Sequence, residues 1–231
     1  MFTQSYIEKI KSKKIFVLEG NIGAGKTTIL NIIGKYFKDV EIVDEPVKQW
    51  QNISGNNLLN LFYSDPQRWG FSFEFYSMLT KTQGLLKALD SEKPIIITER
   101  SLLSDKIFID LSKELGKLNK MEYHMLMNTY DFYLQNIYPP LTGIIYLDTP
   151  VEQCVKRINK RNRLEESNIK KTYLEAIKKK LDELVKSSSM LIIKIDGIYD
   201  CERDCSMVCD NISKYWHPIK SPKIENHREE N

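Results

Sequence analysis

The residues in this sequence that are best suited to chemistry are Gly20 to Thr27, which read GNIGAGKT and match the pattern G-x-x-x-x-G-K-[ST]. The pattern follows an apolar run and precedes apolar residues at helical spacing. In such a loop the backbone N–H groups point at phosphate oxygens, the lysine reaches the β- and γ-phosphates, and the hydroxyl can bind Mg²⁺. The sequence therefore predicts a site for a nucleoside triphosphate. Its predicted contacts are Gly20, Asn21, Ile22, Gly23, Ala24, Gly25, Lys26, Thr27 and Thr28.

Two other classes of protein carry this loop, and the rest of the sequence disfavours both. A regulatory GTPase needs D-x-x-G and N-K-x-D, but no Asp of this chain is followed by Gly three residues later. The segment NKRN at 159–162 lacks the Asp that would bind guanine. A mechanical ATPase needs an effector domain, for which 231 residues leave little room. A small kinase acting on a small acceptor is therefore expected.

Charged side chains follow three of the predicted strands. They are Glu45 in DEP, Glu99 with Arg100 in TERS, and Asp148 in LDTP. Ligands of an open α/β sheet bind at the carboxyl ends of its strands. Phosphoryl transfer to a hydroxyl needs a base, a metal ion and cations around the transferred group. By position alone, each of these acids could serve that chemistry, cap a helix or simply face solvent.

An arginine cluster follows further along the chain, in RINKRNRLEE. Arg157 and Arg161 are four residues apart, and Arg163 lies just beyond the expected end of the helix. Arginine makes forked contacts to phosphate oxygens that lysine cannot make, and lysine is abundant elsewhere in this chain. The cluster therefore predicts a lid over phosphates, at about 157–166, in preference to a solvated helix face.

Five continuous apolar runs alternate with longer stretches of helical periodicity. Continuous runs are typical of strands that are covered on both faces, and the helices between them supply the crossovers of a parallel sheet. We predict an α/β fold of three layers, P-loop NTPase-like, with a five-stranded parallel sheet flanked by helices. The predicted strands are 13–20, 40–46, 93–101, 141–150 and 190–197, and the helices beyond the loop's own are 55–63, 68–90, 102–116, 119–136, 150–160, 168–188 and 200–215.

Composition limits the domain organisation and the partners. Hydrophobic residues make up 42% of the chain and charged residues 28%, as in ordinary globular proteins. We expect one domain over 1–216 and a loose polar tail over 217–231. The net charge of +3 does not indicate a polynucleotide partner. Because no apolar run could span a membrane and the first residues resemble no leader, we expect a soluble, cytoplasmic protein without a membrane partner.

The four cysteines do not predict a metal site. Cys201, Cys205 and Cys209 are spaced in steps of four, which would align them on one helical face, and Cys154 stands alone. Metal sites rarely take three successive ligands from one helix, and no nearby His completes the set. We expect small buried or half-buried helix residues instead.

Several motifs together resemble those of the deoxyribonucleoside kinase family, which contains deoxycytidine, deoxyguanosine and insect multisubstrate deoxynucleoside kinases. The motifs are GNIGAGKTT, EPVKQW, YSDPQRWGFSFEFY, ERSLLSD and RINKRNRLEE, in the family's order and spacing between about residues 14 and 200. Several motifs in register are far more specific than the phosphate loop alone. The resemblance implies phosphorylation of a nucleoside 5′-hydroxyl, with ATP and Mg²⁺ as cofactors and a homodimer as the usual assembly.

The resemblance also implies roles for the catalytic residues. Glu45 would take the proton of the 5′-hydroxyl, and Arg100 would hold that hydroxyl and its developing charge. Glu99 would hold Mg²⁺ alongside Thr27, and Lys26 would contact the transferred phosphate.

The substrate and the lid receive further roles from the same resemblance. Tyr63 and Glu166 would bind the sugar 3′-hydroxyl, with Tyr63 crowding the 2′ position and so favouring deoxyribose. Arg157, Arg161 and Arg163 would close over the ATP phosphates. The remaining residues assigned to the nucleoside are Val47, Trp50, Phe73, Glu74, Ser77, Lys81, Asp105 and Ile109.

The sequence departs from the family where the base would bind. Glu74 stands where the family usually has Gln, Lys81 where cytidine- and purine-type members usually have Arg, and Ile109 where many have Phe. Glu74, Ser77 and Lys81 share one helical face. Keeping a cation at Lys81 opposite Asp105 resembles the members that prefer cytidine or purines over thymidine.

The charge of Glu74 decides what the base site can recognise. An ionised carboxylate only accepts hydrogen bonds, which favours guanine, whereas burial could keep the group protonated and make it imitate Gln. Lys81 nearby would favour the ionised form. Without the resemblance, Glu74 would be interpreted as a surface acid on an amphipathic helix.

Two alternatives to a deoxynucleoside kinase remain open from the sequence. A nucleoside monophosphate kinase of the thymidylate type shares the fold and the loop, but such enzymes tend to show an Asp-Arg-Tyr-type motif where this chain has ERS. A non-catalytic, nucleotide-dependent binding module is the second alternative. Turnover of ATP that depends on added nucleoside would exclude it.

Overall fold

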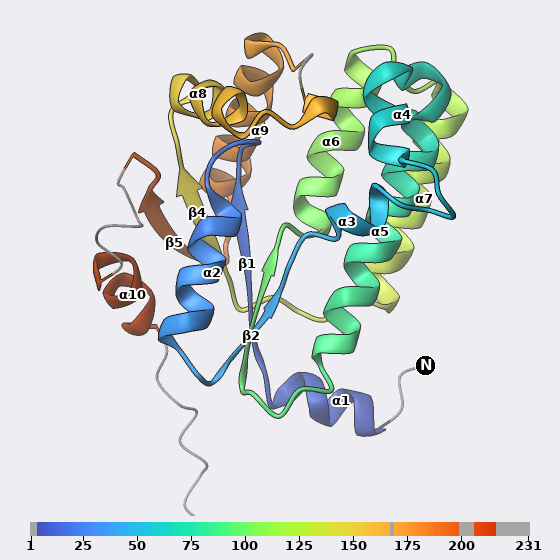
Figure 1. Cartoon of the computed structure of the whole chain (residues 1–231). Coiled ribbons are helices and arrows are strands. Elements are labelled where there is room, and N and C mark those ends of the chain that lie inside the picture. The colour runs from blue at the N-terminus through green and yellow to red at the C-terminus, as the bar shows by residue number, and fades with distance from the viewer. Residues whose placement is uncertain (1–3, 167–168, 199–205, 216–231) are drawn as a thin grey trace, which may run out of the picture.

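A computed structural model describes residues 4–166, 169–198 and 206–215 of the chain. Five strands form one sheet in the order β2-β3-β1-β4-β5, and every pair of neighbouring strands is parallel. Helices cover both faces of this sheet (Figure 1). The predicted α/β fold with a five-stranded parallel sheet is therefore confirmed. The strands are β1 (Lys14–Gly20), β2 (Val40–Val43), β3 (Ile95–Glu99), β4 (Gly143–Asp148) and β5 (Leu191–Asp196).

The helices follow the predicted order, with two additions. A helix at the start of the described chain, α1, and the short α3 were not predicted. Of the predicted helix at 200–215, residues 206–213 are helical and 200–205 lie outside the described residues, as does the predicted tail. The helices are α1 (Gln4–Lys11), α2 (Lys26–Tyr36), α3 (Val47–Trp50), α4 (Leu58–Ser64), α5 (Pro66–Ala88), α6 (Leu102–Glu114), α7 (Lys120–Asn136), α8 (Val151–Arg161), the 3₁₀ turn η1 (Leu164–Glu166), α9 (Lys171–Ser187) and α10 (Ser206–Ser213).

The second strand ends earlier than predicted. β2 pairs with β3 only as far as Val43, opposite Thr98, and the chain then leaves the sheet. Pro46 is the N-cap of α3 and has no backbone N–H to donate to a strand ladder. The consequence is functional, because Glu45 lies in the connection between β2 and α3 instead of in the strand.

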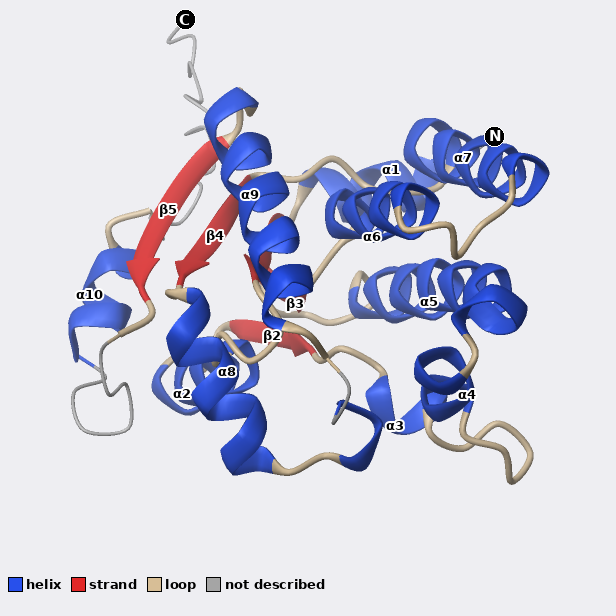
Figure 2. Cartoon of the chain, turned by 90° about the horizontal axis from the view of Figure 1, so that it is seen from above, coloured by secondary structure: helices blue, strands red, loops and turns tan. Residues whose placement is uncertain are grey.

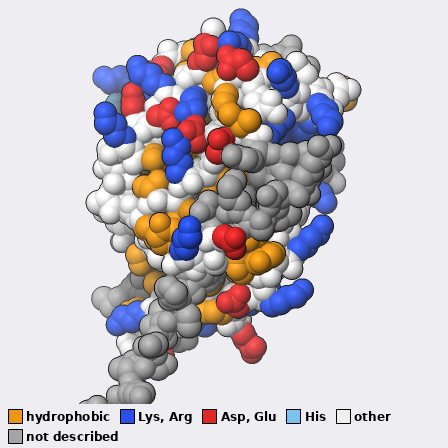
Figure 3. Space-filling model, turned by 90° about the vertical axis from the view of Figure 1, so that its left-hand side faces the viewer, with side chains coloured by type: hydrophobic (Ala, Val, Ile, Leu, Met, Phe, Trp, Pro, Cys, Tyr) orange, Lys and Arg blue, Asp and Glu red, His pale blue; other side chains and the backbone are white. Residues whose placement is uncertain are grey.

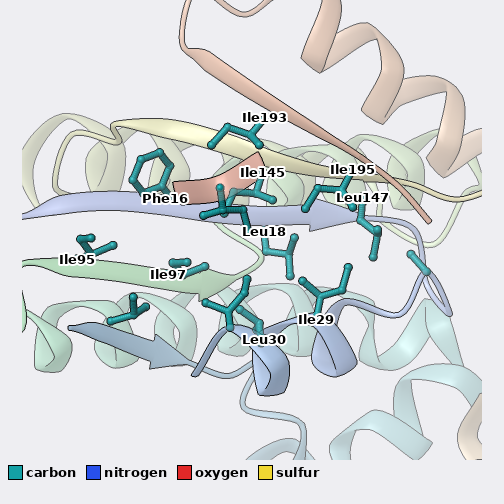
Figure 4. Packing of buried hydrophobic residues seen from close by; sticks show 14 of the residues in the cluster. Phe16, Leu18, Ile29, Leu30, Ile95, Ile97, Ile145, Leu147, Ile193 and Ile195 are labelled. Atoms are coloured by element: carbon teal, nitrogen blue, oxygen red, sulfur yellow. The ribbon is translucent and has the colours of Figure 1, made fainter. Parts of the chain in front are cut away.

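Alternate residues of β1 face opposite sides of the sheet. Phe16 and Leu18 pack with α2, α8 and α10, whereas Val17 packs with α6 and α9, and Ile15 with α5 and α1. Figure 4 shows the first of these clusters, where Ile29 and Leu30 of α2 meet the strand residues. The view from above in Figure 2 separates the two layers of helices. β1 is thus buried on both faces and holds the loop that follows it.

Parallel register brings the carboxyl ends of the central strands to one edge. Leu18 of β1 pairs with Glu99 of β3, and Gly20 pairs with Leu147 of β4. α8 and the start of α9 lie above this edge in Figure 1. The residues that follow β1, β2 and β3 therefore converge beneath α8.

The described residues include surface side chains of both charges and two buried cysteines. None of the helices in the described ranges combines the length and the apolar character needed to cross a bilayer. On the face in Figure 3, basic side chains alternate with acidic ones near the top of the molecule. Cys154 and Cys209 are buried, as expected for small helix residues, and Cys201 and Cys205 lie outside the described residues.

Candidate active site

The loop between β1 and α2 is shaped by two glycines with left-handed backbone. Gly23 has φ 74° and Gly25 has φ 102°, conformations that side chains rarely tolerate. A Cβ on Gly23 would lie 2.7 Å from the carbonyl oxygen of Cys154, so α8 approaches the loop too closely for any other residue. The predicted phosphate loop therefore has the backbone that its motif requires.

Lys26 is the first residue of α2 and turns back over the loop. Its Nζ donates to the carbonyl oxygens of Gly20 (3.3 Å) and Asn21 (3.0 Å). Burial lowers the pKa of Lys26 to about 8, helped by the charge of Arg100 and opposed by Glu99. An ammonium held this way is desolvated, and an anion placed beside it would raise its pKa again.

Thr27 and Glu99 provide the oxygen atoms expected for a hard metal ion. The Thr27 hydroxyl donates to Glu99 Oε2 at 2.9 Å, and Lys26 Nζ lies 3.8 Å from Glu99 Oε1. Glu99 is 4% exposed, and burial raises the pKa of this carboxyl although Lys26 opposes the shift. A hydroxyl and a carboxylate facing a phosphate-binding loop fit Mg²⁺, which prefers oxygen ligands and keeps water molecules.

A cleft of about 650 Å³ lies beside the loop, and we call it the P-loop cleft. Arg157 crosses its wall, donating from Nη1 to the carbonyl oxygen of Ala24 (2.5 Å) and from Nη2 to that of Gly197 (2.9 Å). Arg157 therefore supports the loop in this state. The side chains and backbone that line the cleft belong to Gly23, Ala24, Gly25, Lys26, Thr27, Thr28, Ile29, Glu99, Leu147, Gln153, Lys156, Arg157, Lys160, Arg161, Arg163, Gly197 and Ile198.

Glu45 and Arg100 form an ion pair between the ends of β2 and β3. Arg100 Nε lies 3.0 Å from Glu45 Oε1. Burial alone would raise the pKa of Glu45, but the charges of Arg100 and Lys26 outweigh it and lower the pKa below its usual value. A carboxylate in this setting stays ionised at neutral pH, so it can accept a proton.

Arg100 is held in an unusual backbone conformation. Its φ is 63°, and its guanidinium lies 4.8 Å above the ring of Phe108. The next residue, Ser101, caps α6 and donates to Glu19 Oε1 at 2.7 Å. Within the described chain, Arg100 Nη1 and Glu19 Oε2 are buried without a hydrogen-bond partner. Arg100 thus keeps a donor available beside Glu45.

Tyr63 lies near Glu166 and near this ion pair, since the charges of all three groups act on its phenol. Burial, with the charge of Glu166, raises the pKa of Tyr63 far above its usual range, so the phenol keeps its proton. Glu166 accepts from Arg161 and, at 2.9 Å, from Arg163. Two of the three lid arginines are therefore bound to an acid in this state.

The lid is also tied to α3 and α4 by a residue that the sequence did not suggest. Glu165 Oε1 accepts from Gln51 Nε2 and from Asn57 Nδ2, both at 2.8 Å. Asn57 in turn caps α4, the helix that carries Tyr63. Only the position of Glu165 beside the arginine cluster could have signalled this link.

Glu74 is buried, which excludes the interpretation as a surface acid. It is 2% exposed and accepts a hydrogen bond at 3.0 Å from the hydroxyl of Ser112 on α6. Burial and the charge of Asp105 raise its pKa to about 7, against the opposing effects of Ser112, Lys81 and Lys117. Ser112 follows Asp105 by seven residues on one helix, and this spacing could have identified it.

Lys81 and Asp105 form a buried pair, and Ser77 Oγ lies 3.5 Å from Asp105 Oδ1. The shared face predicted for Glu74, Ser77 and Lys81 is buried at all three positions. Ile109 is fully buried as well, in a cluster with Met78 of α5.

Aromatic side chains form the wall next to this group. Trp50 meets Phe73 edge-on at 5.3 Å, and Phe62 stacks on Phe73 at 4.5 Å. The indole of Trp50 donates to Thr80 Oγ1 at 2.9 Å, and Val47 packs in the same cluster. Apart from Glu166 on η1, the residues assigned to the base and the sugar therefore lie together on α3 to α6.

Of the strand-end acids, Asp148 does not join the site. It pairs with Lys178 at 3.0 Å and with Lys194 at 2.6 Å, and it does not line the P-loop cleft. The other two acids, Glu45 and Glu99, face the loop. In the described part of the chain, no cluster of three potential metal-binding His, Cys, Asp or Glu side chains is present.

Comparison with known proteins gives one family and several relatives. The family model described as deoxynucleoside kinase matches residues 16–216. The chain is 37% identical to the deoxycytidine kinase of Bos taurus over 194 residues, which cover 74% of each protein. It is 35% identical to a protein of fowlpox virus named as a probable deoxycytidine kinase, over 86% of this chain and 87% of that protein. It is 38% identical to the mitochondrial thymidine kinase 2 of Homo sapiens, over 74% of this chain and 64% of that protein.

Proposed function

Because this chain belongs to the deoxynucleoside kinase family, we propose that it transfers the γ-phosphate of ATP to the 5′-hydroxyl of a deoxyribonucleoside. The observation that supports this most is the Glu45–Arg100 pair, 3.0 Å apart, beside Lys26 and Glu99. It puts a carboxylate, a guanidinium and an ammonium around one point at the carboxyl edge of the sheet. That is the set of charges that in-line phosphoryl transfer requires.

Glu45 acts as the base in this proposal. Its lowered pKa keeps it ionised, so it can hydrogen-bond to the 5′-hydroxyl and accept its proton as the oxygen attacks phosphorus. Arg100 holds the carboxylate through Nε and offers its unpaired Nη1 to the attacking oxygen. Orientation and charge stabilisation, without a covalent intermediate, supply the rate.

The phosphate side is handled by the loop and the lid. The loop's N–H groups and Lys26 bind the phosphates, and Thr27 and Glu99 would hold Mg²⁺, which neutralises phosphate charge when bound. When ATP binds, Arg161 and Arg163 leave Glu166 and bind phosphate oxygens instead. Glu166 is then released toward the sugar 3′-hydroxyl beside Tyr63.

The base preference that we propose is deoxycytidine or a purine over thymidine. The buried Lys81–Asp105 pair supports it by the resemblance to such members. Several relatives are named deoxycytidine kinases, although one is named a thymidine kinase. Initial rates with the four deoxynucleosides decide between these outcomes.

We also propose a homodimer, a single kinase domain over 1–216 and a cytoplasmic location. The outer face of α7 supports the dimer, since Met121, Met125 and Phe132 are 69%, 49% and 55% exposed there. Their spacing of four and seven residues puts them on one side of the helix. An apolar stripe of this kind marks an association surface.

The test of this function is Glu45→Gln, with Asp44→Asn as the matched control. The amide that replaces the Glu45 carboxylate cannot take a proton, so turnover should fall at least about a hundredfold while nucleoside affinity changes little. Asp44 is exposed and adjacent, and its variant should behave as wild type. Steady-state rates and nucleoside titrations measure both.

Three results would contradict the proposal. Near-wild-type turnover of Glu45→Gln would remove Glu45 as the base. Faster phosphorylation of deoxynucleoside monophosphates than of nucleosides would favour the monophosphate kinase alternative. Binding of ATP and nucleoside without any turnover would favour the binding module.

A further inference from the structure

Lys117 lies beside the residues assigned to the base, although no motif pointed to it. Its ammonium lies 5.2 Å from the ring centre of Phe62 on α4 and 4.6 Å from that of Tyr173 on α9. Its backbone N–H donates to the carbonyl oxygen of Ser112 at 2.8 Å. A Cβ on Gly70 would lie 3.1 Å from the carbonyl oxygen of Lys117, so the loop packs tightly on α5. Lys117 is thus fixed in place between α4, α5, α6 and α9.

Two cations, Lys81 and Lys117, lower the pKa of Glu74, but Lys81 is already paired with a carboxylate. Lys81 is bound to Asp105, whose negative charge raises the pKa of Glu74 and so works against Lys81. No carboxylate in the described ranges is within ion-pair distance of Lys117. Ser112 links the two residues, because its carbonyl oxygen accepts the N–H of Lys117 at 2.8 Å and its hydroxyl donates to Glu74 at 3.0 Å. The charge of Lys117 accordingly lowers the pKa of Glu74, and the charge of Glu74 opposes the effect of burial on the pKa of Lys117.

We propose that Lys117 is a positioning residue for base selection: its ammonium favours the ionised form of Glu74, and the charge of Glu74 decides which base edge binds. This inference rests on the kinase function proposed above. Lys117 acts through Glu74 and need not touch the substrate. The rings of Phe62 and Tyr173 hold the ammonium by cation–π attraction.

The other polar groups around Glu74 come from α5, α6 and α9. From α6, the Ser112 hydroxyl donates to Glu74 and Asp105 remains paired with Lys81 of α5. α9 contributes Tyr173, whose pKa is raised by burial, so its phenol keeps its proton.

The two charge states of Glu74 match different base edges. A protonated carboxyl donates one hydrogen bond and accepts another, which matches the acceptor N3 and the 4-amino group of cytosine, and the acceptor N1 and the 6-amino group of adenine. An ionised carboxylate accepts two, which matches the adjacent N1–H and 2-amino group of guanine. Each mismatch leaves a buried polar group unpaired, which is costly.

Neutral pH is where this switch should be visible. The pKa of Glu74 is raised to about 7, so the protonated form predominates below that pH and the ionised form above it. Removing the ammonium of Lys117 removes one of the effects that lower this pKa. The midpoint of the switch should then move to higher pH.

The experiment measures kcat/KM for deoxyguanosine, deoxyadenosine and deoxycytidine with ATP at several values between about pH 6 and 8.5. The ratio of deoxyguanosine to deoxyadenosine should rise by at least about tenfold across this range, since deoxyguanosine loses a mismatched hydrogen bond and deoxyadenosine gains one. The ratio of deoxycytidine to deoxyadenosine should stay constant, because both need protonated Glu74. Ratios cancel any pH effect on the phosphoryl transfer step that the substrates share.

Four variants separate Lys117 from its surroundings. In Lys117→Met the midpoint of the rising ratio should move up by about half a pH unit, whereas Lys117→Arg should keep it. Glu74→Gln should make both ratios independent of pH. Lys120→Met removes an exposed cation three residues away and should match wild type. Urea unfolding checks that each variant is folded. If Lys117→Met does not fold, Lys117→Arg still tests whether a positive charge at this position keeps the midpoint.

The outcomes distinguish this inference from the function on which it rests. Phosphorylation of deoxynucleosides with a ratio that does not depend on pH, or a midpoint unchanged in Lys117→Met, overturns the inference and leaves the kinase function intact. A midpoint that moves equally in Lys120→Met also overturns it. No phosphorylation of any deoxynucleoside contradicts the proposed function, and the inference falls with it.

Discussion

Glu74 is a carboxylic acid at a position where its ionised form destabilises the fold. It lies among aromatic and aliphatic side chains of α5 and is 2% exposed, with one hydrogen bond, from Ser112, to offset the loss of water. Charge in such a place costs energy unless it is paired. Its pKa of about 7 reports that balance.

Stability should therefore depend on pH through this group. The folded state binds the proton of Glu74 more tightly than the unfolded state, where the pKa is about 4.5. The contribution to stability is full below that value and is lost as the pH rises through about 7. Glu74→Gln lacks this loss, so its free energy of unfolding relative to wild type should increase by at most about 3 kcal/mol between about pH 5 and 8.

Urea unfolding of both proteins at three pH values measures this difference. Glu183→Gln changes an exposed acid of α9 and should leave the difference from wild type constant with pH. A constant difference between Glu74→Gln and wild type would mean that folded Glu74 is ionised throughout the range, as it is in the unfolded chain. This readout is independent of enzyme activity.

Not every residue of the site could be predicted from the sequence. Glu45, Glu99 and Arg100 were candidates because they lie at strand ends, which the parallel register brings together, and the family resemblance supplied their roles. Lys117 could not be predicted, because its position depends on how one loop packs against Gly70, Phe62 and Tyr173. Contacts between distant segments leave no periodic signal in a sequence.

At the scale of elements, the lid is part of a structural frame as well as a set of arginines. Arg157 of α8 holds the carbonyl oxygens of Ala24 and Gly197, and Glu165 of η1 holds Gln51 and Asn57. The first link fastens α8 to the P-loop, and the second fastens η1 to α3 and α4. The two sides of the site are therefore connected through one short segment.

Removing the second link should weaken both substrate sites. In Glu165→Ala, the amides of Gln51 and Asn57 lose their acceptor, at a cost of about 1–2 kcal/mol in the free energy of unfolding. KM for nucleoside and for ATP should both rise several-fold, because η1 no longer fixes Glu166 and Arg163 relative to α4. Kinetics and urea unfolding measure these effects.

Glu152→Ala is the control, since it removes an acid of α8 that is exposed and pairs only with Lys171 in the described residues. It should change neither KM nor stability by much. An effect on stability alone in Glu165→Ala would contradict the connection between the two sites.

The elements themselves were largely predictable, and the exceptions have physical causes. The central strands β1, β3 and β4 are nearly continuous buried apolar runs, because helices cover both faces of the sheet, whereas the edge strands β2 and β5 carry charged residues such as Glu41 and Lys194. α1 was missed because it has only 8 residues and few apolar side chains, and it is held by Tyr6 and Ile10 packing under α5. The second strand was predicted to be too long because Pro46, the last residue of the extended run, is already the N-cap of α3.

At the scale of the whole molecule, the sheet divides the site between two groups of helices. α2 and α8 border the P-loop cleft, and α3 to α6 carry the residues assigned to the nucleoside (Figure 2). β1 lies between β3 and β4, so its loop is placed where the two groups meet. This is the switch point at which open α/β sheets bind ligands. α7 lies outside both groups and lines neither.

The exposed face of α7 should therefore mediate self-association without taking part in catalysis. Met125→Glu combined with Phe132→Glu puts two charges into the apolar stripe and should convert the dimer to a monomer. Wild type should sediment at twice the 27.1 kDa mass of one chain, and the double variant at that mass. Tyr36→Glu, at an exposed aromatic residue at the end of α2, should leave the dimer intact. Wild type that is monomeric at micromolar concentration, or a double variant that still dimerises, would place the interface elsewhere or remove it.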